Sequence, residues 1–292
     1  MELLFLLLPV AAFTGWILGR NHKSKSNSTD YSDISVDYLR GIRYLLNEQE
    51  DKALDIFVKM VEENSEVVEI HLALGNLFRK QGEVERSIRI HQNLIARPTL
   101  NKEHREQALF ELAQDYMKAG LLDRAEKLFV DAMNNKHFSS MALSNLLIIY
   151  QQEKEWQKAI NIAEKLAYMG DKNYNTMQSH FYCELAHEDI LKKDLKSATY
   201  RIQKALYADK KNVRASIQEG DLALSEMRYK PALKAYKRIE VQDPVYLGEV
   251  ISKIHDCYHA LGRQADFLEY VSTIDKKYKI NLSSAVRHIR NI

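Results

Sequence analysis

The sequence has little of the residue types that interrupt or cross-link a chain. Its 292 residues include 10 glycines, 4 prolines and 2 cysteines. Glycine and proline mark turns and end helices, so their scarcity beside frequent leucine, alanine, lysine and glutamate predicts a mostly helical protein. Cys183 and Cys257 lie far apart and form no CxxC pair, which argues against a disulfide framework and against a cysteine-based zinc site.

An excess of charge of one sign is also absent. Lysine and arginine number 42 and aspartate and glutamate 40, for a net charge of +2. Proteins that bind nucleic acid usually carry a basic excess, so the balance argues against a nucleic-acid partner.

Motifs that carry chemistry are missing as well. The chain has no GxxxxGKS/T, HExxH, GxSxG or GxGxxG. His180, Cys183 and His187 share one face of a predicted helix, but their place in the repeat pattern below favours ordinary helix residues over metal ligands. We therefore expect a protein that is not an enzyme and holds neither a metal nor a cofactor in this chain.

The first twenty residues, MELLFLLLPVAAFTGWILGR, form the one long apolar run. Residues 3–19 carry no charge, and Arg20, Lys23 and Lys25 follow directly. At about 1.5 Å per residue this run spans roughly 26 Å, at the short end of what crosses a bilayer. A secretory signal has its basic residues before the run and a small-x-small site after it, and neither is present. We expect residues 1–20 to be an uncleaved membrane anchor; a cleaved signal or a peripheral helix is the alternative.

The basic cluster after the run predicts an orientation. Basic residues flanking a span stay on the cytoplasmic side, so Arg20, Lys23 and Lys25 place the rest of the chain in the cytoplasm and the N-terminus outside. Residues 21–33 are polar and have no periodicity, which is typical of a flexible tether.

A repeat of about 34 residues occupies residues 34–280. One position, usually small, recurs with spacings of 34, 38, 34, 39, 34 and 35 residues. We call it the crossing position; its members are Gly41, Gly75, Ala113, Leu147, Ala186, Gly220 and His255. A second small residue follows twelve positions later in six copies, and Phe267 takes its place in the seventh. This pattern is typical of the tetratricopeptide repeat, in which two antiparallel helices approach closely at small residues.

The pattern predicts an all-α tetratricopeptide-repeat superhelix of about seven helix pairs over residues 34–280. Gly82, Gly120 and Gly262 lie where the first helix of a pair should end. The two wide spacings predict longer connections at about 98–104 and 170–177. Residues 281–292 are expected to form a partial or capping helix.

Stacked pairs create a concave groove lined by the first helix of each pair, which suits an extended peptide or a partner's surface. Residues one and four positions after the crossing position are expected to face this groove. Those we select as partner-binding candidates are Asn76, Arg79, Gln114, Met117, Gln151, His187 and Asp221.

Five segments resemble a known family, the lipopolysaccharide assembly protein B family of Gram-negative bacteria. They are ELLFLLLPVAAFTGWILGR (2–20), HLALGNLFRKQGEVERSIRIHQ (71–92), DYMKAGLLDRAEKLF (115–129), EWQKAINIAEKL (155–166) and HFYCELA (180–186). The resemblance implies an inner-membrane protein with one span and cytoplasmic repeats. It further implies an adaptor that promotes degradation of the UDP-3-O-acyl-N-acetylglucosamine deacetylase, its client, by the membrane-anchored ATP-dependent zinc protease.

The resemblance also implies an inner-membrane partner that senses lipopolysaccharide and contacts the span. Gly15 and Gly19 form a small-xxx-small face suited to such a contact. Members of the family also carry a C-terminal rubredoxin-type metal domain, and no pair of CxxC motifs follows residue 280 in this sequence. We expect the chain to be either a fragment or a shortened member of the family. Two alternatives stay open: a structural assembly factor that joins lipopolysaccharide synthesis and transport proteins without a proteolytic role, and a periplasmic repeat protein of reversed orientation.

Overall fold

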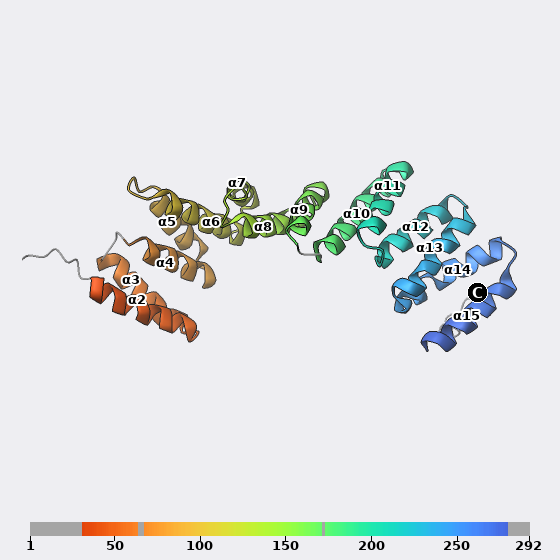
Figure 1. The fold of residues 1–292 in the computed structure, drawn as a ribbon, viewed down its shortest axis with the longest axis horizontal. Helices are drawn as coiled ribbons and strands as arrows, with labels where there is room; N and C mark the ends of the chain where they lie inside the picture. The colour runs from red at the N-terminus through yellow and green to blue at the C-terminus, as the bar shows by residue number, and fades with distance from the viewer. Residues whose placement is uncertain (1–30, 64–66, 171–172, 280–292) are drawn as a thin grey trace, which may run out of the picture. The chain divides into compact units, whose positions relative to one another are not determined.

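The structure is a computed structural model that describes residues 31–63, 67–170 and 173–279. Regular structure within these ranges is helical throughout, with fourteen α-helices and one 3-10 helix (Figure 1). The chain divides into two compact units, Met1–Ala119 (unit 1) and Gly120–Ile292 (unit 2). None of the helices in the described ranges is long and apolar enough to cross a bilayer.

The predicted anchor at 1–20 and the final residues 281–292 lie outside the described part of the chain, so both stay predictions. The first described helix begins at Tyr31, so the last three residues of the predicted tether are helical.

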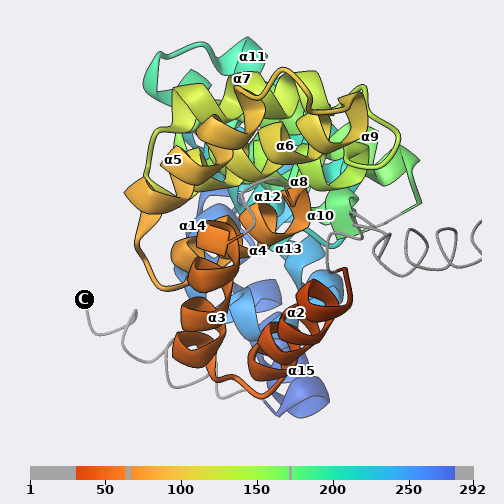
Figure 2. The same ribbon diagram turned by 90° about the vertical axis from the view of Figure 1, so that its left-hand side faces the viewer.

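Unit 1 contains five helices, and each packs against the next along the chain. In both views α2 lies beside α3 (Figure 2). The helices are α2 (Tyr31–Leu46), α3 (Glu50–Glu63), α4 (Val68–Lys80), α5 (Val84–Ile95) and α6 (Lys102–Lys118).

Unit 2 contains the remaining helices. They are α7 (Leu122–Ala132), α8 (Ser139–Gln152), α9 (Trp156–Tyr168), α10 (Asn173–Leu191), α11 (Leu195–Ala208), α12 (Val213–Ser225), α13 (Tyr229–Gln242), η2 (Pro244–Tyr246), α14 (Leu247–Ala260) and α15 (Gln264–Tyr278). Within the two units, six of the seven predicted helix pairs are in contact, which confirms the all-α repeat for the described residues: α2–α3, α4–α5, α8–α9, α10–α11, α12–α13 and α14–α15. The third predicted pair would join α6 of unit 1 to α7 of unit 2 and stays a prediction. The superhelical path of the whole array stays a prediction.

The crossing position behaves as the repeat pattern predicts. Its first six members are buried, and the small residues twelve positions later, from Ala53 to Ala232, are fully buried. Where the crossing residue is glycine, a ring from the second helix fills the space: a Cβ at Gly220, for example, would overlap the Tyr236 ring. Where the crossing residue is the larger Leu147, the residue sixteen positions later, where the ring stands in the glycine copies, is the small and buried Ala163. A small side chain on one helix is therefore matched by a large one on the other, so that the space between them stays filled, as close-packed interiors require.

The turn between the two helices of each pair has one backbone geometry. The residue seven positions after the crossing position has a positive φ in every copy, between 56° and 83°. Glycine occupies it at the three predicted places, Gly82, Gly120 and Gly262, and the other copies hold Glu48, Lys154, Lys193 and Met227. Left-handed backbone suits glycine and strains other residues, so four of the seven turns carry a conformational cost.

The two wide spacings do not produce the longer connections predicted at 98–104 and 170–177. Helix α6 begins at Lys102 and α10 at Asn173, and these are the two longest helices, with 17 and 19 residues. The four or five extra residues correspond to about one helical turn. They lengthen the first helix of the third and fifth pairs rather than the loop before it.

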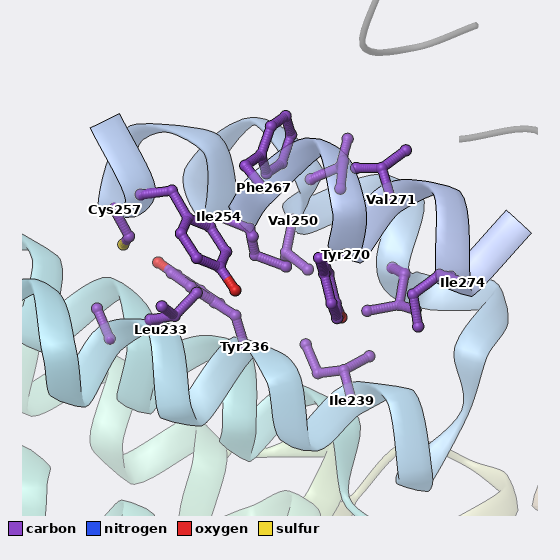
Figure 3. Packing of buried hydrophobic residues seen from close by; sticks show 14 of the residues in the cluster. Leu233, Tyr236, Ile239, Val250, Ile254, Cys257, Phe267, Tyr270, Val271 and Ile274 are labelled. Atoms are coloured by element: carbon purple, nitrogen blue, oxygen red, sulfur yellow. The ribbon is translucent and has the colours of Figure 1, made fainter. Parts of the chain in front are cut away.

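The core at the end of unit 2 takes its buried residues from α13, α14 and α15, and one, Ala223, from α12 (Figure 3). Tyr236 and Ile239 of α13, Val250 and Ile254 of α14, and Phe267 of α15 meet there. Phe267 takes the small-residue position of the seventh copy and is buried all the same. The seventh pair is therefore a packed repeat in spite of its divergent sequence.

Candidate partner-binding site

Arg79, the groove candidate expected to face a partner, lies within a network of hydrogen bonds inside unit 1. Its guanidinium donates to Glu111 Oε2 at 2.7 Å and to Asp115 Oδ1 at 2.7 Å, joining α4 to α6. It also donates to Asn76 Oδ1 and Gln114 Oε1, two other groove candidates. The structure thus brings three predicted residues together, but as partners of one another; their role in binding stays a prediction.

The Asp115 carboxylate is the centre of this network and is fully buried. Besides Arg79, it accepts a hydrogen bond from Ser87 Oγ at 2.7 Å and lies 2.5 Å from His91 Nδ1. A buried carboxylate is costly unless it is paired and hydrogen-bonded, and here three groups satisfy it. This role could not be predicted from the sequence, where Asp115 looks like one more charged residue of a solvated helix face.

Gly75 makes room for the network. A Cβ at this crossing position would overlap the imidazole of His91, which is buried completely. Ser87 Oγ also donates to the Gly75 carbonyl oxygen at 2.7 Å. The second repeat therefore replaces the usual apolar filling of a helix pair with a polar cluster, in which the Asp115 carboxylate is satisfied and His91 Nε2 is buried without a partner among the described residues.

The candidates of unit 2 lie in more varied surroundings. Asp221 accepts from Tyr236 Oη and from Lys253 Nζ, both at 2.6 Å, so it too has a structural role. Gln151 is half-buried, as is Met117 of unit 1, and His187 is exposed.

His187 lines a pocket of about 620 Å³ that lies wholly within unit 2. We call it the inner pocket. Its lining residues are Thr176, His180, His187, Asp209, Lys211, Asn212, Val213, Arg214, Ile217, Gln218, Gln242, Asp243, Tyr246 and Glu249. This volume lies within the 300–1,000 Å³ typical of ligand sites.

The inner pocket follows the repeat register. His180, Arg214 and Glu249 lie six residues before the crossing position on α10, α12 and α14, the first helices of the last three pairs. Ile217 lies three residues before it and supplies part of an apolar surface with Val213. The groove positions selected from the sequence lie one and four residues after the crossing position. They include one lining residue, His187, and none of these other lining residues.

The walls of the pocket are held by polar contacts. Arg214 Nη1 lies 2.5 Å from Glu184 Oε1, and this hydrogen bond holds the pKa of Glu184 below its usual range. Gln218 donates to the Cys183 carbonyl, and Gln242 donates to the Lys210 carbonyl. Because the amide nitrogens are committed, the amide oxygens of both glutamines are fixed in place. Within the described residues both oxygens are buried and lack a donor.

His180, Cys183 and His187 lie in different surroundings and do not form a common ligand set. His180 and His187 are exposed, while Cys183 is fully buried and burial raises the pKa of its thiol to about 12. Across the described ranges, no three His, Cys, Asp or Glu side chains are grouped in a way that could hold a metal ion.

Comparison with known proteins agrees with this fold. A family model described as tetratricopeptide repeat matches residues 70–106. Among solved structures, the C-terminal part of a repeat-containing protein from Cytophaga hutchinsonii superposes with a TM-score of 0.52 at 12% identity, covering 83% of this chain and 96% of that one. The helix pairs and the matching family model define the class: a tetratricopeptide-repeat protein.

Two curated relatives narrow the class to a family. Lipopolysaccharide assembly protein B of Escherichia coli (strain K12) is 42% identical over 271 residues, which cover 93% of this chain and 70% of the relative. The protein of the same name from Haemophilus influenzae is 38% identical over 275 residues, 91% of this chain and 69% of the relative. The chain belongs to the lipopolysaccharide assembly protein B family.

The remaining sequence candidates, Gly15, Gly19, Arg20, Lys23 and Lys25, lie outside the described residues. Their assignments to a membrane partner and to topology stay predictions.

Proposed function

We propose that this protein takes part in lipopolysaccharide assembly as a non-enzymatic scaffold. The observation that carries the proposal is the 42% identity over 93% of the chain to a lipopolysaccharide assembly protein B. The helix pairs of both units support it, since stacked repeats present long binding surfaces without a reaction centre.

We further propose the finer role implied by the family. The protein is an adaptor at the inner membrane that brings the UDP-3-O-acyl-N-acetylglucosamine deacetylase to the membrane-anchored ATP-dependent zinc protease. The apolar run at 3–19 supports a membrane anchor, and the basic residues after it support cytoplasmic repeats. An anchor confines client and protease near one surface and so raises their effective concentration.

The experiment is depletion of the protein followed by measurement of the deacetylase half-life. An adaptor predicts a longer half-life. An unchanged half-life together with defective lipopolysaccharide assembly would favour the structural assembly factor, and no effect on either would remove the scaffold proposal.

The proposed topology has its own test. A periplasm-only reporter enzyme fused to the C-terminus should be inactive, and a cytoplasm-only reporter should be active. Replacing Arg20, Lys23 and Lys25 with acidic residues should disturb this orientation, because these charges are what retains the flank in the cytoplasm. Activity of the periplasmic reporter in the unaltered protein would contradict the cytoplasmic assignment.

A further inference from the structure

We propose that the inner pocket of unit 2 binds an arginine side chain presented by an extended peptide segment of a partner protein. This inference rests on the proposed scaffold function and specifies the chemistry that one of its surfaces recognises. It is carried by the charges, the hydrogen-bond acceptors and the exposed ring that line the pocket.

Among the residues that the structure describes, the pocket lining has more carboxylates without an ion-pair partner than basic groups without one. Asp209, Asp243 and Glu249 are acidic, whereas Lys211 and Arg214 are basic. Arg214 is already compensated by Glu184, so three carboxylates face one uncompensated ammonium, that of Lys211. Asp209 and Asp243 each use one oxygen to accept from a backbone N–H, which fixes their orientation. The Glu249 carboxylate makes no ion pair or hydrogen bond with any residue the structure describes.

Two further acceptors belong to the same lining. The amide oxygens of Gln218 and Gln242 lack a donor within the described ranges, although both are buried. An unsatisfied buried acceptor is unfavourable, and a donor brought by a ligand or an ordered water relieves that cost. A ligand that supplies N–H groups therefore fits this pocket better than one that supplies oxygens.

Tyr246 adds an aromatic surface beside the acidic groups. Its residue is 42% exposed, and it lies in η2 between Asp243 and Glu249 in the chain. A guanidinium stacks on an aromatic face and donates from a planar fork that matches a carboxylate. Lysine has neither the plane nor the fork, so the geometry favours arginine.

The pocket also suits a peptide rather than a free small cation. Val213 and Ile217 provide apolar contact from α12, and Thr176, His180 and His187 extend the lining along α10. About 620 Å³ exceeds the space needed by one side chain and leaves room for neighbouring peptide residues.

The test measures binding of labelled, end-capped hexapeptide pools to the full chain in detergent by fluorescence anisotropy. Each pool has randomised flanks and one fixed central residue: arginine, lysine, citrulline or glutamate. Citrulline keeps the shape of arginine and removes its charge. We expect the arginine pool to bind at least tenfold more tightly than the citrulline pool, with the lysine pool between them.

Variants locate the effect. Glu249→Gln should reduce the arginine-to-citrulline preference to about twofold, and Tyr246→Leu should reduce it as well. Glu164→Gln, which changes an exposed glutamate of α9 outside the pocket, is the matched control and should keep the full preference. Circular dichroism checks that each variant is folded.

Equal binding of arginine and citrulline pools, tighter binding of the glutamate pool, a preference that survives Glu249→Gln, or no binding of any pool would each overturn the inference. These peptide measurements are independent of the depletion experiment, which tests the scaffold function by the deacetylase half-life. The scaffold function and the arginine preference can therefore be refuted independently of each other.

Discussion

Asp115 gives the sharpest test of how unit 1 is held together. Replacing it with alanine removes the carboxylate that joins Arg79 of α4, Ser87 and His91 of α5 to helix α6. Ser87 keeps its bond to the Gly75 carbonyl, and Arg79 keeps Glu111. The His91 ring, which is completely buried, loses its one partner among the described residues.

The magnitude follows from these losses. Removing one partner of a buried charge pair costs about 3–5 kcal/mol, and we expect Asp115→Ala to lie in that range. Asp115→Asn keeps an acceptor for Arg79 and Ser87 but removes the charge. Leaving one buried group poorly satisfied costs about 1–3 kcal/mol, so the asparagine variant should lose that amount.

The assay is urea unfolding followed by circular dichroism, combined with hydrogen exchange read by mass spectrometry. Because repeats contact mainly their neighbours, protection should fall in α4–α6 and stay in α12–α15. Asp55→Asn, at an exposed position of α3, is the control and should change stability by less than about 0.5 kcal/mol. An Asp115→Ala variant as stable as Asp55→Asn would refute the structural role of the network.

Three further predictions concern single positions. Lys154→Gly relieves a residue with φ of 57° and should stabilise unit 2 by about 0.5–1 kcal/mol in urea unfolding. Gly220→Ala forces a Cβ into the Tyr236 ring and should destabilise by about 1–3 kcal/mol, whereas Gly248→Ala meets no atom within 4 Å and should be neutral or stabilising. Cys183, with its pKa raised from 9.0 to about 12, should react with iodoacetamide at pH 8 roughly 1,000-fold more slowly than in the unfolded chain, as measured by peptide mass spectrometry.

Each of these has a clear contrary result. Loss of stability in Lys154→Gly would show that the turn is not strained. Equal stability of the two alanine variants would show that the crossing position tolerates a side chain. Rapid modification of folded Cys183 would show that the thiol is open to solvent.

The helix pairs could be predicted from the sequence because their signal is periodic. Each crossing position repeats about 34 residues later, and the period places both helices and the turn between them. The wrong prediction of longer connections at 98–104 and 170–177 also has a physical reason. A wide spacing says that residues were inserted, but not whether they form a loop or another helical turn.

The groove chemistry could be predicted only in part. Arg79 is positioned by Glu111 and Asp115, which lie 32 and 36 residues further along the chain, and single-helix reasoning does not see such partners. The inner pocket carries a signal that was available, since His180, Arg214 and Glu249 recur six residues before the crossing position. That they line one pocket with Tyr246 and Gln242 depends on how η2 and the end of α13 fold, which no spacing reveals.

The arrangement also changes how Arg79 should be tested. A charge reversal there places a carboxylate against Glu111 and the buried Asp115, so Arg79→Glu should unfold part of unit 1. Loss of partner capture in that variant would not by itself identify a binding residue. Variants on the exposed side of the inner pocket are better probes.

The most direct test of the account is the half-life of the deacetylase in cells that carry pocket variants. Thr176→Trp fills the inner pocket from an exposed position, and Asn175→Trp adds the same ring one residue away, outside the lining. We predict a long half-life after depletion, restored to a short one by the unaltered protein and by Asn175→Trp but not by Thr176→Trp. A half-life that does not change on depletion would contradict the proposed function, and full restoration by Thr176→Trp would contradict the role of the pocket.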